Sequence, residues 1–528
     1  MLDPSQLHDA VRREGGLSRR LFLAYAASLS STCLTLQRAR GGAPPARFVN
    51  DPFSLGVASG DPAPRSVVLW TRLAPAPLEP FGGMPAENVE VHWEIARDEA
   101  FQSIVDRGTT VATPQLAHAV HVEPAGLQPD RWYWYRFRAG DAESPVGRTR
   151  TLPRRTATPD EVKFAFASCQ HLEAGWYTAY EQMAADALDL VFHLGDYIYE
   201  GRGKAGGVRR HQGREIRSLA DYRIRHAQYK TDPLLQAMHA QCPWIVVWDD
   251  HEVDNNYASD IAEQGNIDPV EFLVRRANAY QAYYEHMPLR RRSLPRGPHL
   301  QLYRKFAWGR LAEFFGLDTR QHRSDQPNGD GRQPLNDAAR SSANTMLGHA
   351  QRDWLQQGLL SSTGAWNGLA QQVMMAVVDQ ADGPDELFSM DSWSGYVQER
   401  DQLMRFLRQR RVANPVVLTG DIHTNWVNDL RIDDRREDSP VTATEFVGTS
   451  ISSGGNGADN APRRESLMAE NPGVRFFNGQ RGYVRCTVTK DRWQSDYQVV
   501  DQVTQPGGRV TTRASFVVES GQPGAQPA

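Results

Sequence analysis

Cysteine is scarce in this sequence. Its 528 residues include four cysteines, Cys33, Cys169, Cys242 and Cys486. They are too few and too scattered to form the disulfide framework of a small secreted scaffold. We expect Cys33 to be removed with an N-terminal signal, so at least one of the other three is unpaired. Cys242 and Cys486 are interpreted as core residues or as one disulfide.

The sequence also lacks an excess of positive or of negative charge. The formal net charge is -4 and the pI is near 6.4. A nucleic-acid binder usually carries a strongly basic face. We interpret the arginine runs at 290–292 and 408–411 as solvated helix ends and predict no nucleic-acid-binding domain. With 40% hydrophobic residues, the chain is long enough for more than one domain.

A long apolar run is also missing. The candidate at 21–36 contains Ser and Thr and is shorter than the roughly 20 residues of a spanning helix, so we predict no transmembrane helix in the mature chain. Arg19 and Arg20 precede this run, and small residues follow it. This order resembles a twin-arginine signal, although an ordinary apolar helix with a basic start is the alternative. We predict a signal region at 1–46, export by the twin-arginine machinery, and a periplasmic or extracellular location.

Strand patterns fill the next segment, residues 47–153. Short runs at 66–70, 89–95 and 131–137 alternate apolar and polar residues and are rich in aromatic and β-branched side chains. Turns with Gly and Pro separate them, which is typical of a β-sandwich. We therefore predict a small all-β domain of fibronectin or immunoglobulin type. An aromatic binding face at 131–137 is the less favoured interpretation.

From residue 154 to about 520, apolar strands alternate with helical patterns. The runs 164–168, 190–194, 244–248 and 415–419 indicate buried strands of a central sheet, and helices are expected at 174–187, 219–239, 269–285 and 351–363. This predicts an α/β domain at 154–520. Segments 201–210 and 328–345 are expected to be loops, and the Gly, Pro and Gln-rich tail 521–528 is expected to be flexible.

Polar blocks follow these apolar strands directly. They are Gly195-Asp196, the segment Trp248 to Asn256, and Gly420-Asp421-Ile422-His423. Open α/β sheets place their sites at such strand ends. So many carboxylates and imidazoles close together repel one another unless they are hydrogen-bonded, protonated or neutralised by metal. Any one block alone is better explained by turns and helix caps, but the three together predict a binuclear metal site.

The order of these blocks resembles the PhoD-type alkaline phosphatases and phosphodiesterases of the calcineurin-like metallophosphoesterase group. The resemblance covers nearly the whole mature chain and rests on motifs at 167–170, 195–200, 248–256, 317–320 and 420–423. It implies a layered β-sheet sandwich flanked by helices. General metallophosphoesterases begin with Asp-x-His and end with Gly-His-x-His. Here Cys169 and Tyr199 would supply ligands instead, and Asp421 stands where a His would be.

The family pattern implies two kinds of cation. Fe3+ would be held by Cys169, Asp196, Tyr199 and His423, because thiolate and phenolate are anionic ligands that favour a trivalent ion. Ca2+ would be held by Asp196, Asp250, Asn256 and Asp421, whose oxygens suit a hard divalent cation. Asn255 is the alternative to Asn256. An inert buried thiol is the alternative for Cys169.

The expected chemistry is attack of a metal-activated water or oxo nucleophile on phosphorus. The predicted catalytic residues are Asp196, Asp250, His251, Arg320 and His423. Arg320 is expected to bind phosphate oxygens with Asp318 fixing its position, and a surface ion pair is the alternative. His251 is expected either to protonate the leaving oxygen or to support a ligand.

The sequence therefore predicts an exported, metal-dependent phosphomonoesterase, phosphodiesterase or both, and a monomer. The ester could be a small molecule, a nucleotide, a lipid or a polymer. A phospholipase D-like phosphodiesterase of the same family is the nearest alternative. From other classes, we weigh a non-catalytic phosphate-binding protein and an adhesion protein built on the β-sandwich.

Overall fold

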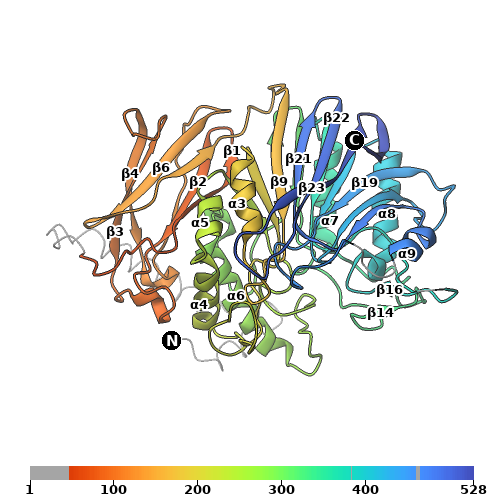
Figure 1. Ribbon diagram of the computed structural model, residues 1–528, viewed down its shortest axis with the longest axis horizontal. Coiled ribbons are helices and arrows are strands. Elements are labelled where there is room, and N and C mark those ends of the chain that lie inside the picture. Colours follow the sequence, from red (N-terminus) through yellow and green to blue (C-terminus); the bar gives the residue numbers. More distant parts are fainter. Residues whose placement is uncertain (1–46, 382, 460–463) are drawn as a thin grey trace, which may run out of the picture. The chain divides into compact units, whose positions relative to one another are not determined.

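Two large sheets form the centre of the computed structural model, which describes residues 47–381, 383–459 and 464–528 (Figure 1). One sheet has ten strands in the order β24-β23-β22-β21-β9-β10-β11-β1-β2-β5, and the other has seven in the order β12-β13-β15-β17-β19-β18-β20. The predicted signal region, 1–46, lies outside the described residues. Among those described, no helix is both long and apolar enough to cross a membrane.

The strands of the ten-stranded sheet are β1 Val57–Ala63, β2 Ser66–Arg72, β5 Ala119–Val122, β9 Glu161–Ala167, β10 Leu190–Leu194, β11 Trp244–Val247, β21 Arg481–Thr489, β22 Arg492–Val500, β23 Val510–Glu519 and β24 Gln522–Pro527. Those of the seven-stranded sheet are β12 Arg304–Trp308, β13 Ala312–Gly316, β15 Trp366–Ala370, β17 Pro415–Thr419, β18 Asn425–Arg431, β19 Val441–Val447 and β20 Val474–Asn478. Two smaller sheets contain β3 Val89–Ala96, β4 Ile104–Ala112, β6 Trp132–Ala139, β7 Ala142–Glu143 and β8 Gly147–Arg150, and β14 Arg332–Gln333 with β16 Phe388–Ser389.

The α-helices are α3 Thr178–Ala185, α4 Leu219–Lys230, α5 Pro233–His239, α6 Pro269–His286, α7 Gly348–Leu360, α8 Val397–Gln409 and α9 Arg464–Glu470. Short 3-10 turns lie at Pro80–Gly83, Pro114–Leu116, Arg291–Ser293 and Trp393–Tyr396.

Aromatic side chains join the two large sheets face to face. Phe164 of β9 and Phe192 of β10 contact Phe314 of β13, with ring centroids 5.3 and 5.0 Å apart. Trp493 of β22 lies edge-on to Phe164 at 5.6 Å. These large rings bury much apolar area between the sheets and so fix their spacing. The mixed α/β class predicted from the sequence is confirmed.

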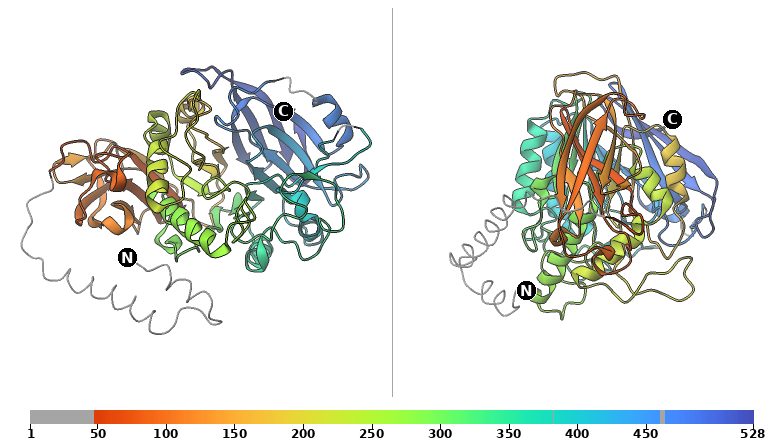
Figure 2. Two further views of the ribbon diagram at one scale, coloured as in Figure 1. Left: turned by 90° about the horizontal axis from the view of Figure 1, so that it is seen from below. Right: turned by 90° about the vertical axis from the view of Figure 1, so that its left-hand side faces the viewer.

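Helices cover the outer faces of both sheets (Figures 1 and 2). Met183 of α3 and Met238 of α5 pack in the core of the ten-stranded sheet, whereas Leu355 of α7 and Leu403 of α8 pack in that of the seven-stranded sheet. The predicted helix at 219–239 is two helices. Asp232 caps the second one and Pro233 occupies its first turn, where a proline interrupts the preceding helix but starts a new one well.

The N-terminal strands divide between two sheets. Strands β3, β4, β6, β7 and β8 form a sheet of their own, but β1, β2 and β5 extend the ten-stranded sheet. The link is a parallel pairing of Gly60 with Trp244. Alternating periodicity predicts that these segments are strands, but it carries no information on which sheet each one joins.

The C-terminal tail is ordered as a strand, which corrects the prediction of a flexible end. Strand β24 pairs antiparallel with β23. Gly524, at φ 111°, donates its N–H to Thr444 Oγ1, and Ala525 donates to Asp429 Oδ1 at 3.0 Å. These tertiary partners stabilise a segment whose composition alone favours a loop.

Four buried imidazoles lie near Tyr197, on the outer side of the ten-stranded sheet. The Tyr197 ring contacts His193, His226 and His239, and His226 stacks on His286 at 4.9 Å. Burial lowers the pKa of His193 to about 3 and holds the pKa values of the other three well below the ordinary 6.5. Protonation of these rings therefore favours the unfolded chain.

We expect the protein to lose stability as the pH falls from 6.5 toward 3. Because the folded-state pKa values are depressed, the unfolded state binds more protons throughout this window. Within this window, each of the four imidazoles lowers the free energy of unfolding by about 1.4 kcal/mol for each pH unit. His226→Phe should reduce the slope of unfolding free energy against pH, measured by denaturant titration, whereas the same change at the exposed His349 should not. Equal slopes in all three proteins would contradict this account.

Candidate metal centre

The polar motifs converge at the carboxyl ends of parallel strands. Cys169 follows β9, Asp196 follows β10 and Asp250 follows β11 in one sheet, while Asp421 and His423 follow β17 in the other. Strand β10 is parallel to both β9 and β11. A bridge between Ser168 and Ser450 runs beside the site. The edge position predicted from the sequence is therefore where these residues meet.

Cys169, Asp196 and His423 form a first donor group. One donor atom from each lies within 4.8 Å of the others. Tyr199 completes this group, because its hydroxyl donates to Asp196 Oδ2 at 2.7 Å and lies 3.1 Å from His423 Nε2. These are the four residues predicted for iron. Burial raises the pKa values of the Cys169 thiol and the Tyr199 hydroxyl well above their usual range, so a thiolate or phenolate here requires a nearby cation.

Carboxylates form a second donor group beside the first. Asp249, Asp250 and Asp421 bring donor atoms within 4.8 Å of one another, and Asp196, Asp250 and His251 do the same. Asp196 therefore belongs to both groups, as a bridging ligand would. Burial raises the pKa of Asp196 to about 7, and the Asp250 carboxylate contributes to the shift. A buried carboxylate shared by two donor groups is stabilised when a positive charge lies on each side of it.

The backbone at these residues adopts an uncommon conformation. Five of the predicted ligands have left-handed φ values: Cys169 at 60°, Asp196 at 54°, Asn256 at 53°, Asp421 at 63° and His423 at 58°. Such values cost about 1–3 kcal/mol each for non-glycine residues and are tolerated where the surroundings enforce them, typically at functional sites.

Glu252 provides part of that enforcement. Its carboxylate accepts the backbone N–H groups of Asp196, Tyr197 and Asp249 at 3.1, 2.6 and 2.9 Å. One buried side chain thus fixes the loops after β10 and β11 together. Burial raises the pKa of Glu252 to about 8. Sequence analysis included this residue in the 248–256 block but gave it no role.

Unpaired polar atoms mark the centre as a place for cations. Asp196 Oδ1 and Asp249 Oδ2 are inaccessible to solvent and have no hydrogen-bond partner. Burial also raises the pKa values of Asp249 and Asp421 well above their usual range, and neighbouring carboxylates raise them further. Orphaned buried oxygens are costly. Bound cations would satisfy them, so the residues present fit a metal centre.

Arg320 is buried in a ring of carboxylates rather than paired at the surface. Its Nε donates to Asp249, and its Nη1 donates to Asp391 Oδ1 at 2.8 Å. Its free Nη2 lies 3.6 Å from Asp250 Oδ2 and 3.7 Å from Asp421 Oδ1. Although burial opposes ionisation, Arg320 and His251 hold the pKa of Asp250 well below its usual value. The surface-pair alternative is thereby excluded.

Asp318 holds the backbone of Arg320. Its Oδ1 accepts the Arg320 N–H at 3.1 Å and the Trp248 indole N–H at 3.1 Å. The side chain is fully buried. It therefore positions Arg320, in line with its predicted role, through the main chain.

His251 is oriented by a carboxylate. Its Nδ1 lies 2.7 Å from Glu200 Oε2, and one fifth of the side chain is exposed. Burial lowers its pKa, but Glu200, Asp196 and Asp250 together raise it well above 6.5. A protonated imidazole with one nitrogen held by a carboxylate can donate from the other. Glu200 is visible in the 195–200 motif, although sequence analysis gave it no role.

Asn256 lies closer to the carboxylates than Asn255. Its backbone N–H donates to Asp250 Oδ2 at 2.7 Å, and its side-chain Nδ2 donates to Asp330 Oδ2 at 2.8 Å, which leaves Oδ1 available. The Asn255 amide instead donates to Glu263 at 2.5 Å. The geometry favours Asn256 as the candidate ligand.

Ser453, in the loop after β19, and Arg481, at the start of β21, support the first donor group, and neither was predicted from the sequence. Ser453 Oγ donates to the Cys169 carbonyl at 2.7 Å and lies 2.7 Å from Tyr199 Oη. Arg481 donates to the His423 carbonyl. Neither residue lies in a motif, so no local signal marks them.

The remaining cysteines do not pair. Cys169, Cys242 and Cys486 are all free and buried in the part of the chain that the structure describes. Burial raises the pKa values of both Cys242 and Cys486. The pKa of Cys486 is raised to about 12. The core interpretation of these two residues is confirmed, and the disulfide alternative is wrong.

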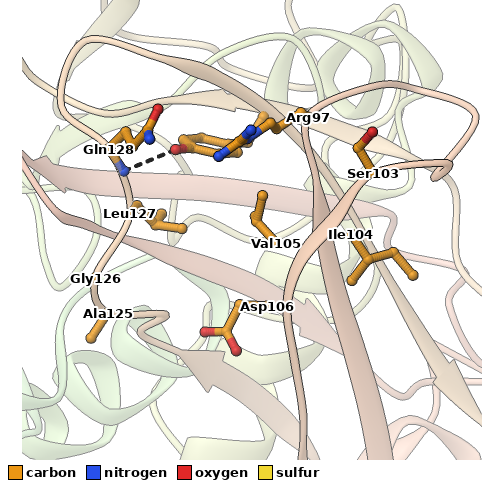
Figure 3. Close-up of a pocket in the computed structure, with 10 residues that line it drawn as sticks. Arg97, Ser103, Ile104, Val105, Asp106, Ala125, Gly126, Leu127 and Gln128 are labelled. Carbon is orange, nitrogen blue, oxygen red and sulfur yellow. Dashed lines mark hydrogen bonds between the residues drawn. The ribbon is translucent and has the colours of Figure 1, made fainter.

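A recess lies elsewhere, in the N-terminal sheets. It has a volume of about 560 Å³ and lies between the start of β4 and the segment 125–128 (Figure 3). The Gln128 N–H donates to Tyr133 Oη at its wall. No motif residue lines this recess. The metal centre is therefore identified by its polar side chains and not by the volume of a recess.

Comparison with known proteins shows similarity to phosphatases along most of this chain. The family described as "PhoD-like phosphatase" matches residues 164–497, and "PhoD-like phosphatase, N-terminal domain" matches residues 38–153. "Alkaline phosphatase D" of Bacillus subtilis (strain 168) is 54% identical over 483 residues, which cover 90% of this chain and 82% of that protein. The solved "Structure of PhoD" superposes with a TM-score of 0.89 at 52% identity, covering 92% of this chain and 93% of that one.

Proposed function

We propose a two-cation mechanism for this chain, which belongs to the PhoD-like phosphatase family and is a phosphatase. The observation that carries the proposal is that Asp196 belongs to two adjacent donor groups, one with Cys169 and His423 and one with Asp250 and His251. Membership of a phosphatase family sets aside a non-catalytic phosphate-binding or adhesion protein.

The two predicted ligand sets differ in chemistry, which supports two different ions. Cys169, Asp196, Tyr199 and His423 combine a thiol, a carboxylate, a phenol and an imidazole, a set that suits Fe3+ once the thiol and phenol are deprotonated. Asp196, Asp250, Asn256 and Asp421 offer oxygens alone, which suit Ca2+. When bound, the cations supply Lewis acidity and activate the water or oxo nucleophile that attacks phosphorus.

His251 acts on the substrate directly, and Arg320 supports the carboxylates beside it. Because Arg320 Nη2 is inaccessible to solvent and lies 3.6 Å from Asp250 Oδ2 and 3.7 Å from Asp421 Oδ1, we assign it to holding these two carboxylates rather than to contact with a phosphoryl oxygen. His251 donates a proton from Nε2 to the leaving oxygen while Glu200 holds Nδ1.

The proton donation predicts an effect that depends on the leaving group. His251→Gln should slow hydrolysis of an alkyl phosphate by about 100-fold or more, the usual contribution of a general acid. A nitrophenyl phosphate, whose leaving oxygen needs little protonation, should be affected much less. The measurement is kcat for both esters in both proteins.

Glu200→Gln tests the same role from its partner. It keeps a hydrogen-bonding side chain but removes the charge that holds His251 protonated. The alkyl ester should again be the more sensitive substrate. Equal losses for both esters in either variant would assign His251 to support of the metal centre instead.

Access to the centre decides whether a monoester or a larger diester can bind. The decisive assay therefore compares the hydrolysis of these two kinds of ester. A monoester and a diester of the same alcohol, offered to protein supplied with iron and calcium, should distinguish a monoesterase from a phospholipase D-like diesterase. Hydrolysis of neither would overturn the proposal. Export through the twin-arginine pathway and a monomeric state remain predictions, the first from Arg19 and Arg20.

A further inference from the structure

A third group of potential ligands lies beside the proposed centre. His171 and Glu173 come from the loop after β9, and His211 comes from the glycine-rich segment 201–213. One donor atom from each lies within 4.8 Å of the others. None of the three belongs to the ligand sets proposed for iron and calcium. Glu173 and His211 are 4% and 2% exposed, so this is not a solvated acidic patch.

The separation of Glu173 and His211 fits two ligands of one ion better than a hydrogen bond. Glu173 Oε2 lies 3.6 Å from His211 Nδ1, beyond the 2.7–2.9 Å of a charge-assisted hydrogen bond. Two donors bound to one tetrahedral ion at 2.0–2.1 Å are about 3.4 Å apart. His211 Nδ1 also lies 3.2 Å from the Gly201 carbonyl oxygen, to which it donates in the absence of an ion and from which an ion would displace its proton. His171 Nδ1 is inaccessible to solvent and has no hydrogen-bond partner. A buried imidazole nitrogen without a partner is a costly arrangement that a cation would relieve.

The other atoms of these side chains are already oriented. Glu173 Oε1 accepts the N–H groups of Lys204 and His211 at 2.8 and 3.0 Å, which leaves Oε2 for an ion. His211 Nε2 lies 2.8 Å from Tyr229 Oη. An imidazole that binds metal through one nitrogen usually makes such a contact through the other, which fixes its tautomer and ring orientation.

We propose that His171, Glu173 and His211 bind a divalent cation of the Zn2+ type. Two imidazoles and one carboxylate are a common zinc donor set, and three protein ligands leave a fourth position for water. The ion would fasten segment 201–213 to the loop that carries Cys169. The His171 ring lies edge-on to Tyr199 at 4.3 Å, so the site also supports that predicted iron ligand.

The test uses Zn2+ alone and the whole protein with its main centre disabled. Asp196→Asn protein should bind Zn2+, and adding Glu173→Gln or His171→Gln should weaken that binding at least about 10-fold by calorimetry. Both changes keep a polar side chain of similar size, and thermal unfolding checks that the variants are folded. His349→Gln, an exposed change, should leave Zn2+ binding unchanged.

The results also separate this site from the proposed catalytic centre. Loss of phosphatase activity in Asp196→Asn protein with Zn2+ binding retained supports both proposals independently. Absence of Zn2+ binding in folded Asp196→Asn protein would overturn the third site. So would unchanged Zn2+ affinity in the folded double variants.

Discussion

Asp196→Asn should lower kcat by about 1000-fold or more. The Asp196 carboxylate belongs to both donor groups, so its loss should weaken binding of both proposed ions and the charge stabilisation they provide. Asparagine has nearly the same shape, and the Glu252 contact is to the backbone N–H, so the loop should keep its position. The measurement is kcat with iron and calcium supplied in excess.

A stability measurement distinguishes this effect from unfolding. Burial raises the pKa of Asp196 to about 7, so above that pH the ionised side chain destabilises the metal-free fold. Metal-free Asp196→Asn protein should therefore be at least as stable as the metal-free wild type at pH 8. Asp353→Asn, at an exposed position on α7, should change neither quantity. An active Asp196→Asn enzyme would refute the bridging role.

Tyr199→Phe should remove visible colour from the protein. A phenolate bound to Fe3+ gives a charge-transfer absorption band, and Tyr199 is the phenol in the first donor group. The change also removes one anionic ligand, so iron content and activity should both fall. Absorption spectra of wild type and variant at equal iron supply provide the measurement.

The matched control is Tyr303→Phe, because Tyr303 is a partly buried phenol that packs against Trp354 rather than against the site. It should leave the band intact. A colourless and fully active wild-type enzyme would contradict iron ligation by Tyr199 whatever the variants show.

The strand ends and their ligands could be predicted because the signals are local. An apolar run followed by Gly-Asp, Asp-Asp-His or Gly-Asp-x-His marks both a buried strand and the side chains at its end. Once the parallel order of β9, β10 and β11 is known, Cys169, Asp196 and Asp250 must meet at one edge. The resemblance to a known family supplied the division between iron and calcium ligands.

Features that depend on distant partners could not be predicted. Ser453 reaches Tyr199 from a loop that no motif marks, and Asp391 meets Arg320 from a segment for which the sequence predicted no element. The tail became a strand because β23 and Asp429 pair with it, contrary to its composition. The break before Pro233, in contrast, had a local signal in Asp232 followed by proline.

Metal analysis of the purified protein tests most directly whether a metal centre is assembled around Asp196. Iron and calcium should both be present in the wild type and strongly reduced in Asp196→Asn protein. Removal of the metals by a chelator should abolish hydrolysis, and their return should restore it. A wild-type enzyme that remains fully active without iron and calcium would contradict the account.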